Sequence, residues 1–166
     1  MSVPDPRILG PGELRKLAEE VQARGGKVVF TNGCFDLLHV GHIRYLRAAA
    51  AWGDMLIIGL NSDESVRRLK GAMRPLVPEM ERAEILAALE MVDYVCIFPE
   101  DTPRELIVAL HPDVLVKGGD YVRSQLAGAD EVESWGGRVV LAEEVEGKST
   151  RCLLAEIKRR QAVDGR

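Results

Sequence analysis

The sequence predicts an α/β fold: a doubly wound, Rossmann-like parallel sheet of five strands with helices on both faces. Two observations and one general rule predict it. Short runs rich in Val, Ile and Leu recur along the chain and are almost continuously apolar, as strands buried on both faces are. Stretches with apolar residues at helical spacing separate these runs. Right-handed crossovers through such helices build a sheet that is covered on both sides.

The chain opens with a helix and a strand. The first expected helix is Pro11–Ala23, in which Leu14 and Ala18 share one apolar face. Gly25-Gly26 ends this helix, because glycine readily adopts the backbone conformation found at helix C-termini. The first expected strand, Lys27–Thr31, follows directly.

The next elements surround the second strand. A helical run from Ile43 to Ala51 precedes the apolar strand Met55–Leu60. Asn61-Ser62 then caps a short helix, since a side-chain oxygen at this position accepts a free backbone N–H. A further helix is expected over Glu79–Leu89, where apolar residues recur at helical spacing.

The second half of the chain continues the alternation. Tyr94–Phe98 is the third expected strand, and Thr102 starts a helix that runs to Leu110 with Pro103 at its first position. Val114–Val116 is the fourth expected strand.

The last three elements complete the predicted sheet and its cover. Ala129–Trp135 is expected to be helical, and Arg138–Leu141 is the fifth expected strand. Ser149 opens a final helix that ends in Lys158-Arg159-Arg160, whose positive charge suits the negative end of the helix dipole.

Length and composition limit the class of protein. The 166 residues predict one domain over 1–166, with an N-terminal helix at about 11–24 and the core at about 27–161. The net charge of −4 argues against a general nucleic-acid-binding surface. No apolar run approaches the roughly 20 residues of a membrane helix, and the N-terminus lacks a signal-peptide pattern. An odd number of scattered cysteines predicts reduced thiols and a cytoplasmic location.

In doubly wound sheets, ligands bind beyond the carboxyl ends of the strands, where the strand order reverses. Residues that directly follow a strand are therefore candidates for a binding site. His111 precedes the fourth expected strand, so we expect it to be structural. Tyr45, Trp52 and Trp135 are expected to serve packing, and the cysteines are expected to be unreactive thiols.

The segment from Asn32 to His42 follows the first strand and opens a helix. His39 and His42 are three residues apart, so they fall on one turn. Unpaired N–H groups and the helix dipole already give that turn a partial positive charge. Two potential cations fit there only if an anion lies between them. Phosphate is the expected anion, because a helix N-terminus is a ready phosphate site.

The residues around the two histidines complete this candidate site. Gly33 and Gly41 would let the backbone approach a ligand closely. Two structural histidines, or a metal site completed by Asp36 or Cys34, are alternatives, although such a metal site matches no common zinc spacing and no metal ligand is assigned. The site residues expected in this segment are Asn32, Gly33, Cys34, Phe35, Asp36, His39, Gly41 and His42.

Two cationic side chains are further candidates. Lys70 could reach a triphosphate as a mobile point charge, or it could be a solvated surface lysine. Arg82 could hold an anion in a bidentate manner. A surface salt bridge from Arg82 to Glu79 or Glu81 is its alternative.

Two later segments also follow strands. Lys117-Gly118-Gly119-Asp120 suggests a flat or anionic group packed against backbone, with Asp120 able to accept from a ribose hydroxyl. Gly147-Lys148-Ser149-Thr150 opens the last helix and offers a second anion site from hydroxyls and free N–H groups. A plain turn and an ordinary helix cap are the alternatives. Together with the histidines and Lys70, the two segments suit a nucleoside triphosphate.

The run from Gly33 to His42 resembles the signature of the cytidylyltransferase-like nucleotidyltransferase superfamily, whose members join a nucleotide to a phosphorylated small molecule and release pyrophosphate. Within it, the chain is similar to the D-glycero-β-D-manno-heptose 1-phosphate adenylyltransferases over about Leu9 to Arg160. The segments that carry this similarity are 30–36, 59–63, 74–75, 81–83, 117–121, 128–132 and 147–150.

The resemblance implies transfer of AMP from ATP to the heptose 1-phosphate, by in-line attack on the α-phosphate. It implies that His39 and His42 contact the triphosphate and that Lys70 and Mg²⁺ neutralise developing charge. Ser149 and Thr150 would hold the outgoing phosphates. No metal-binding side chain is implied.

The resemblance also implies roles for the remaining segments and for partners. Asp36 and Lys117 would order the loops and the substrate, and Gly118, Gly119 and Asp120 would border the nucleoside. A homo-oligomer is expected, and a separate sugar kinase would supply the acceptor if this is a stand-alone form. The ADP-heptose product would feed lipopolysaccharide or another surface glycan.

Two other functions remain open at this point. One is a cytidylyltransferase for glycerol 3-phosphate or a related alcohol phosphate. Its cytidine-using relatives carry an arginine in the segment before Ser149, where this chain reads Glu144-Val145-Glu146-Gly147. The other is a non-catalytic nucleotide-binding protein.

Overall fold

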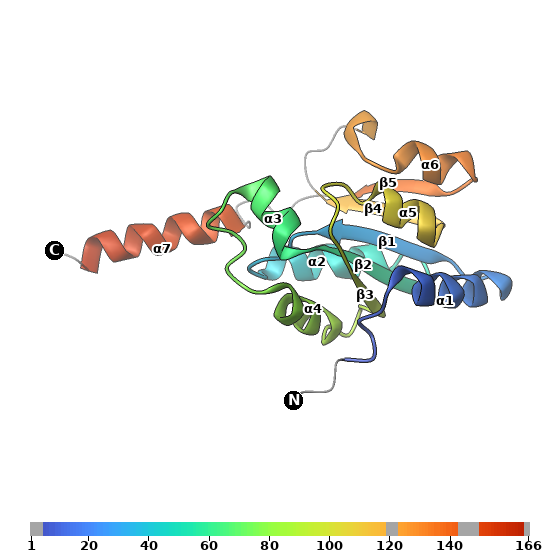
Figure 1. Ribbon diagram of the computed structural model, residues 1–166, viewed down its shortest axis with the longest axis horizontal. Helices are drawn as coiled ribbons and strands as arrows, with labels where there is room; N and C mark the ends of the chain where they lie inside the picture. Colours follow the sequence, from blue (N-terminus) through green and yellow to red (C-terminus); the bar gives the residue numbers. More distant parts are fainter. Residues whose placement is uncertain (1–4, 119–122, 143–149, 165–166) are drawn as a thin grey trace.

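The computed structural model describes residues 5–118, 123–142 and 150–164. Its sheet has five parallel strands in the order β3-β2-β1-β4-β5 (Figure 1). This arrangement confirms the predicted fold class. The strands are β1 (Val28–Gly33), β2 (Met55–Asn61), β3 (Tyr94–Phe98), β4 (Val114–Gly118) and β5 (Arg138–Ala142).

Helices alternate with these strands along the chain, as the spacing of apolar residues predicts. They are α1 (Pro11–Ala23), α2 (Val40–Ala50), α3 (Asp63–Lys70), α4 (Glu79–Ala87), α5 (Arg104–Leu110), the 3-10 turn η1 (Arg123–Gln125), α6 (Ala129–Ser134) and α7 (Thr150–Asp164).

Each face of the sheet has its own hydrophobic core. Helices α1, α5 and α6 cover one face, where Leu14, Ile107 and Val132 are fully buried. Helices α2 and α4 cover the other face through Leu46 and Leu86, which are also fully buried. Burying one such side chain contributes about 1.5–3 kcal/mol. The two cores fix the sheet as a rigid floor for the residues that follow each strand.

The strand order reverses between β1 and β4. From β1 the chain moves outward through β2 and β3, and it then returns to β4 on the other side of β1 (Figure 1). Val29 of β1 pairs with Leu56 on one side and with Val114 on the other. The carboxyl ends of β1 and β4 therefore form the switch point at which doubly wound sheets bind ligands.

Two helix starts differ from the predicted ones. Helix α2 begins at Val40, earlier than the predicted run, because His39 already has an extended N-cap conformation (φ −142°, ψ 169°). The helix expected from Thr102 begins at Arg104, with Pro103 at the N-cap. Thr102 therefore lies in the β3–α5 connection. The predicted cap of α3 is confirmed, since Ser62 Oγ accepts from Ser65 N at 3.2 Å.

Helix α7 extends away from the sheet (Figure 1), and most of its described side chains are exposed. Its first turn lies beside the β1–α2 loop, because Thr150 Oγ1 donates to the Leu37 carbonyl oxygen at 3.2 Å. The start of α7 is therefore placed at the carboxyl end of β1.

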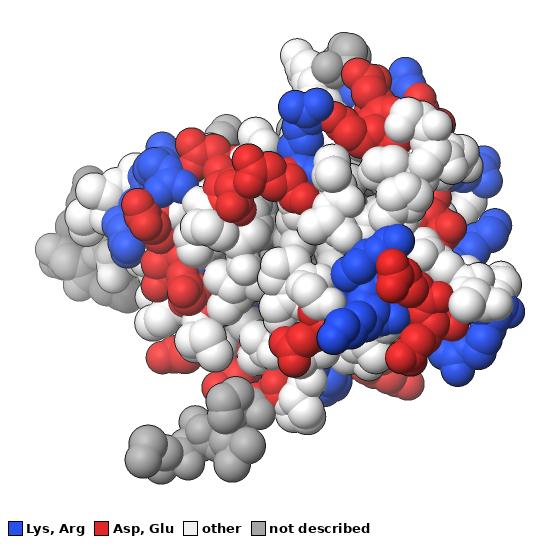
Figure 2. All heavy atoms as spheres, turned by 45° about the vertical axis from the view of Figure 1, so that its right-hand side comes forward, with Lys and Arg blue, Asp and Glu red and all other residues white. Residues whose placement is uncertain are grey.

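The described surface carries charges of both signs. Figure 2 shows Lys and Arg interspersed with Asp and Glu over one face of the molecule. Within residues 5–118, 123–142 and 150–164, no helix is both long and apolar enough to cross a membrane.

Candidate functional site

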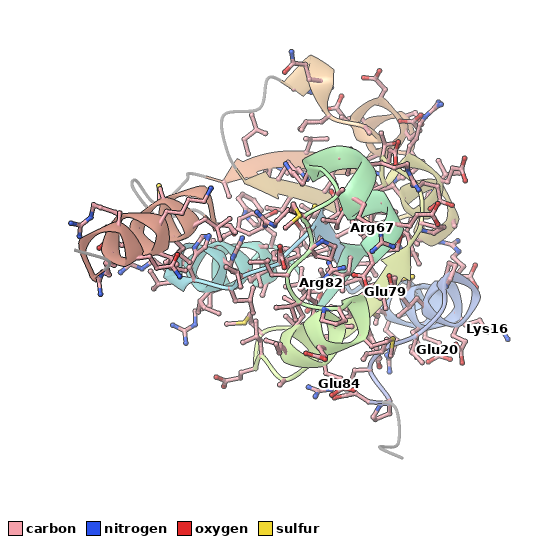
Figure 3. All side chains as sticks on the ribbon, turned by 60° about the vertical axis from the view of Figure 1, so that its left-hand side comes forward. Lys16, Glu20, Arg67, Glu79, Arg82 and Glu84 are labelled. Carbon is pink, nitrogen blue, oxygen red and sulfur yellow. The ribbon has the colours of Figure 1, made fainter. Side chains whose placement is uncertain are left out.

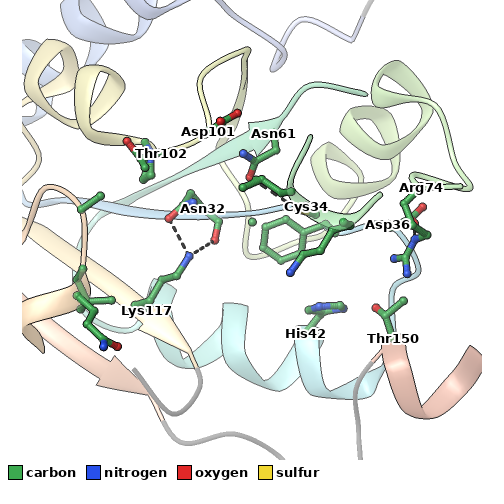
Figure 4. A pocket seen from close by; sticks show the side chains of 18 of the residues that line it. Asn32, Cys34, Asp36, His42, Asn61, Arg74, Asp101, Thr102, Lys117 and Thr150 are labelled. Atoms are coloured by element: carbon green, nitrogen blue, oxygen red, sulfur yellow. Dashed lines mark hydrogen bonds and ion pairs between the residues drawn. The ribbon is translucent and has the colours of Figure 1, made fainter. Parts of the chain in front are cut away.

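A cavity of about 1060 Å³ lies beyond the carboxyl ends of the strands (Figure 4). Asn32 and Lys117 are the second-last residues of β1 and β4 and face each other in this cavity (Figure 4). Lys117 Nζ donates to the Asn32 carbonyl and side-chain oxygens at 3.1 and 3.0 Å. Several predicted site residues meet in this cavity. Those that line it are Asn32, Gly33, Cys34, Phe35, Asp36, His42, Lys70, Lys117 and Thr150.

The two histidines form a stacked pair at the start of α2. The ring centroids of His39 and His42 are 3.8 Å apart, with 25° between the ring planes. Phe35 packs its ring against His42 with centroids 5.2 Å apart. Phe35 itself has φ +43°, a left-handed conformation that is rare for a bulky residue. Such strain persists where the surrounding structure holds it, as it does at many functional sites.

The environment of His42 keeps its imidazole neutral. Burial, and then the neighbouring His39, lower the pKa of His42 from 6.5 to about 4. Its Nδ1 atom is buried and has no hydrogen-bond partner among the described residues. A neutral ring can donate one hydrogen bond, and a bound anion would favour its protonated form. The stacked rings leave no space for an anion between them, so an anion bound here would contact their edges, and the anion site stays a prediction.

Lys117 is held at the switch point in a largely enclosed position. Burial lowers its pKa to about 8, with the positive charge of Lys70 acting in the same direction and Cys34 acting against it. At neutral pH Lys117 thus remains mostly protonated and supplies a positive charge beside Asn32. The bonds to Asn32 fix that charge over the gap between β1 and β4.

Cys34 lies in the same cavity, beside the cations. Burial raises the pKa of its thiol, although Lys70, Arg82, Lys117 and Arg74 act to lower it. The thiol therefore stays protonated near neutral pH, which supports the prediction that Cys34 is not a nucleophile.

Asp36 orders the connection between α3 and α4. Its carboxylate accepts from Arg74 Nε at 2.5 Å and from the backbone N–H groups of Leu76 and Val77 at 2.8 and 3.0 Å. The Asp36 side chain is only 1% exposed. This agrees with its expected role in ordering the loops. With all three partners in the protein, Asp36 is poorly suited to hold a metal ion.

Arg82 was expected either to hold an anion or to form a surface salt bridge, and both expectations need correction. It makes no salt bridge to Glu79 or Glu81, and it does not line the cavity, because its side chain is fully buried (Figure 3). Its guanidinium donates to the carbonyl oxygens of Cys34, Asn61 and Val77 and pairs with Asp63 Oδ1 at 2.7 Å. Arg82 therefore fixes the loops beneath the cavity from within.

Two glycines of the site lie against aromatic rings of the protein, and the expected close approach of a ligand to Gly33 and Gly41 stays a prediction. A Cβ atom on Gly33 would lie 2.9 Å from the Phe35 ring, and one on Gly118 would lie 3.0 Å from the ring of Tyr45. Both glycines thus make room for aromatic rings of the protein. Tyr45 in turn donates to the Val116 carbonyl oxygen at 3.0 Å and contacts Thr31 Oγ1. Gly41 is buried in the first turn of α2.

Some predicted site residues cannot be placed. Gly119, Asp120, Gly147 and Ser149 lie outside the described residues. His111, by contrast, lies before the start of β4, at the end of the sheet opposite to the cavity. Its ring stacks on Trp135 with the ring centroids 4.0 Å apart, as expected of a structural residue.

Asn61 is a cavity residue that follows a predicted strand but is absent from the predicted site residues. It ends β2, is 3% exposed, and donates through Nδ2 to Ser65 Oγ at 3.0 Å. Its position directly after the predicted strand Met55–Leu60 was the available signal. Asp101 and Thr102, which follow β3, also line the cavity and were missed for lack of a recognisable motif.

The described residues contain no group of three or more His, Cys, Asp or Glu side chains that could hold a metal ion. A cation bound here would therefore depend on oxygens of a ligand. Mg²⁺ commonly binds in that way, through phosphate oxygens and water.

Comparison with known proteins gives consistent matches. The model of the family described as cytidylyltransferase-like matches residues 30–163. The chain is 57% identical over 155 residues to the bifunctional protein HldE of Geobacter metallireducens and 55% identical over 156 residues to that of Trichlorobacter lovleyi. These matches cover 93% and 94% of this chain but 32% of each relative, so the chain spans about a third of their length.

A solved structure shares the fold. The crystal structure of the lipopolysaccharide core biosynthesis protein from Thermoplasma volcanium matches with a TM-score of 0.63 and 25% sequence identity. The match covers 74% of this chain and all of the other.

Proposed function

Since the chain belongs to the cytidylyltransferase-like family and is a nucleotidyltransferase, we propose that it transfers AMP from ATP to D-glycero-β-D-manno-heptose 1-phosphate. The observation that carries the proposal is the stacked His39–His42 pair, which shares one end of the sheet with Lys70 and Lys117. Histidine and lysine donors around one cavity suit a polyphosphate.

The reaction would be an in-line displacement at the α-phosphorus of ATP. A phosphate oxygen of the acceptor forms the new P–O bond, and the bond to the β-phosphate oxygen breaks as pyrophosphate leaves with the electron pair. The acceptor is already an anion, so no strong general base is needed. Positioning and charge stabilisation then supply most of the catalysis.

His42 lines the cavity and His39 stacks on it, and both would share this work with other side chains of the cavity. His39 and His42 donate to the triphosphate, and the approach of phosphate raises the pKa of His42 from its low value in the free protein. Lys70 and Lys117 add positive charge, and Thr150 would contact the outgoing phosphates from the first turn of α7. Mg²⁺ carried by the phosphates would neutralise part of the developing charge.

The choice of ATP and of the heptose phosphate rests on the sequence segments similar to heptose 1-phosphate adenylyltransferases. The name of the Thermoplasma volcanium protein, which refers to lipopolysaccharide core biosynthesis, agrees with a role in surface-glycan assembly. A cytidylyltransferase for an alcohol phosphate is the rival within the same family.

A pyrophosphate-release assay tests the proposal. Purified protein is mixed with Mg²⁺, with ATP or CTP, and with each of a panel of acceptors: heptose 1-phosphates of both anomers, hexose 1-phosphates and glycerol 3-phosphate. We expect kcat/KM to be highest for ATP with the β-heptose 1-phosphate. Equal rates with CTP, or a preference for glycerol 3-phosphate, would contradict it, and no release with any pair would favour a non-catalytic nucleotide-binding protein.

A further inference from the structure

The cavity extends well beyond the switch point. If the histidine turn and Lys117 hold the nucleotide of the proposed reaction, the nucleotide covers the carboxyl ends of β1 and β4. On the other side of β1, the cavity continues over the carboxyl ends of β2 and β3. Asn61 ends β2, and Asp101 and Thr102 lie in the connection that follows β3 (Figure 4). This half of the cavity is left for the acceptor.

Among the described residues that line the cavity, accessible negative charge lies at one place. Among the described residues that line it, the carboxylates belong to Asp36 and Asp101. The Asp36 side chain is 1% exposed and holds Arg74, whereas the Asp101 side chain is 51% exposed. An accessible carboxylate repels phosphate but is a strong acceptor for hydroxyl groups. The chemistry at Asp101 therefore suits a neutral polyol.

Helix α3 holds Asp101 in place. Arg68 Nε pairs with Asp101 Oδ1 at 2.7 Å, and the other nitrogens of the same guanidinium reach the Pro99 carbonyl oxygen at 2.5 Å and Glu64 Oε1 at 3.0 Å. Three acceptors fix the orientation of the planar guanidinium. The same helix ends at Lys70, which lines the cavity. Helix α3 thus supplies Lys70, a cation that suits a phosphate, and through Arg68 it fixes the Asp101 carboxylate on the same side of the site.

We propose that Asp101 and Thr102 bind hydroxyl groups on the sugar part of the acceptor and that Arg68 positions Asp101 for this contact. The proposal rests on the proposed function and adds the subsite that selects the sugar. The carboxylate accepts from two neighbouring hydroxyls or from one, and the Thr102 hydroxyl donates or accepts beside it. Asp101 and Thr102 are then specificity residues, and Arg68 acts only through Asp101.

Separate KM values for the two substrates test this subsite. With D-glycero-β-D-manno-heptose 1-phosphate as acceptor, we expect Asp101→Ala to raise the acceptor KM about tenfold or more and Thr102→Val about fivefold. The KM for ATP should stay within about twofold in both, because the nucleotide lies on the other side of β1. Asp101→Asn keeps the shape of the side chain and should have an intermediate acceptor KM.

The positioning role of Arg68 has a matched control on the same helix. Arg68→Gln should raise the acceptor KM about threefold, and Arg68→Lys should restore part of the loss, because lysine keeps one donor for Asp101. Arg67 is exposed beside Arg68, so Arg67→Gln should leave both KM values unchanged (Figure 3). Circular dichroism confirms that each variant is folded.

The outcomes separate this inference from the proposed function. If the wild type uses the heptose phosphate but Asp101→Ala and Thr102→Val leave its KM unchanged, or raise the KM for ATP equally, the sugar subsite is wrong and the function stands. If the wild type uses no sugar phosphate at all, the proposed function is wrong and the subsite falls with it.

Discussion

His42 shows how much one residue of this site depends on its surroundings. Its ring lies between the stacked His39 and the edge of Phe35, and burial keeps it neutral in the free protein. The same ring becomes a donor to phosphate in the proposed reaction. Its catalytic and its titration behaviour can be tested separately.

Replacing His42 should abolish activity and spare the fold. We expect His42→Ala to lower kcat for pyrophosphate release by about 10³-fold, because donors aimed at developing charge contribute that much in other enzymes. The matched control is His111→Asn at the opposite end of the sheet, since asparagine tolerates the left-handed backbone of His111 (φ +53°). Activity of His42→Ala within tenfold of the wild type would contradict the role of His42.

His42 should also make stability depend on pH. Its pKa is about 4 in the folded protein and 6.5 in the unfolded chain, so between these pH values the unfolded chain binds more protons. Stability contributed by the neutral ring is therefore lost as pH falls from about 6.5 towards 4. We expect a contribution on the order of 1 kcal/mol after allowing for partial exposure. Urea unfolding at pH 4.5 and 7 should show a smaller difference in His42→Phe than in the wild type; an equal difference would contradict it.

At the scale of elements, the connection between α3 and α4 is tied to the histidine loop by buried charges. Asp36 holds the backbone of Leu76 and Val77, and Arg82 joins the ends of β1 and β2 to the same connection. Because Lys70 ends α3 at the start of this connection, these bonds fix its position relative to His42.

Removing the buried guanidinium should destabilise the whole arrangement. Arg82→Ala leaves three carbonyl oxygens and Asp63 without their donor, and we expect a loss of about 3 kcal/mol in the free energy of unfolding. The exposed Arg67→Ala on α3 should change it by less than about 0.5 kcal/mol. Urea unfolding measures both, and equal effects would show that Arg82 carries no such structural role.

A larger residue at Gly33, the last residue of β1, should also disturb the site. Gly33→Ala places a Cβ 2.9 Å from the Phe35 ring, which must then move against His42. We expect kcat to fall about tenfold, since small displacements of catalytic groups are costly. Gly12→Ala, with no atom within 4 Å of the new Cβ, is the control and should keep full activity. Unchanged activity of Gly33→Ala would show that the ring can yield without moving His42.

At the scale of the whole molecule, the sheet brings the cavity residues together from distant parts of the chain. Asn32, Asn61 and Lys117 lie at the carboxyl ends of β1, β2 and β4, and Asp101 follows β3. They meet because all five strands are parallel. Ligand binding should therefore stabilise the complete fold.

Nucleotide binding should raise Tm selectively. A ligand at about 100 times its Kd stabilises the folded state by about 2.7 kcal/mol, which corresponds to a rise of roughly 5–10 °C for a chain of this size. We expect this shift with Mg²⁺ and ATP, and less than half of it with CTP at the same concentration. Thermal unfolding followed by circular dichroism measures it, and equal shifts would contradict the preference for ATP.

The sequence by itself determined the strand and helix alternation, the parallel sheet and the position of the histidine turn. These follow from local patterns: apolar runs, helical spacing, and the rule that ligands bind after strands. It also identified Lys70, Lys117 and Thr150 as residues of one site, because each could be placed relative to a strand or a helix end.

Only the tertiary structure decided which side chains contact one another across those segments. It showed that Arg82 is buried, that Gly33 and Gly118 make room for the rings of Phe35 and Tyr45, and that Asp101 is held by Arg68 at the cavity edge. Partners far apart in the sequence leave no periodic signal, because their contacts depend on how elements pack. The local motifs therefore indicate the type of reaction. Packing decides whether a charged side chain lines the cavity or stabilises the loops around it.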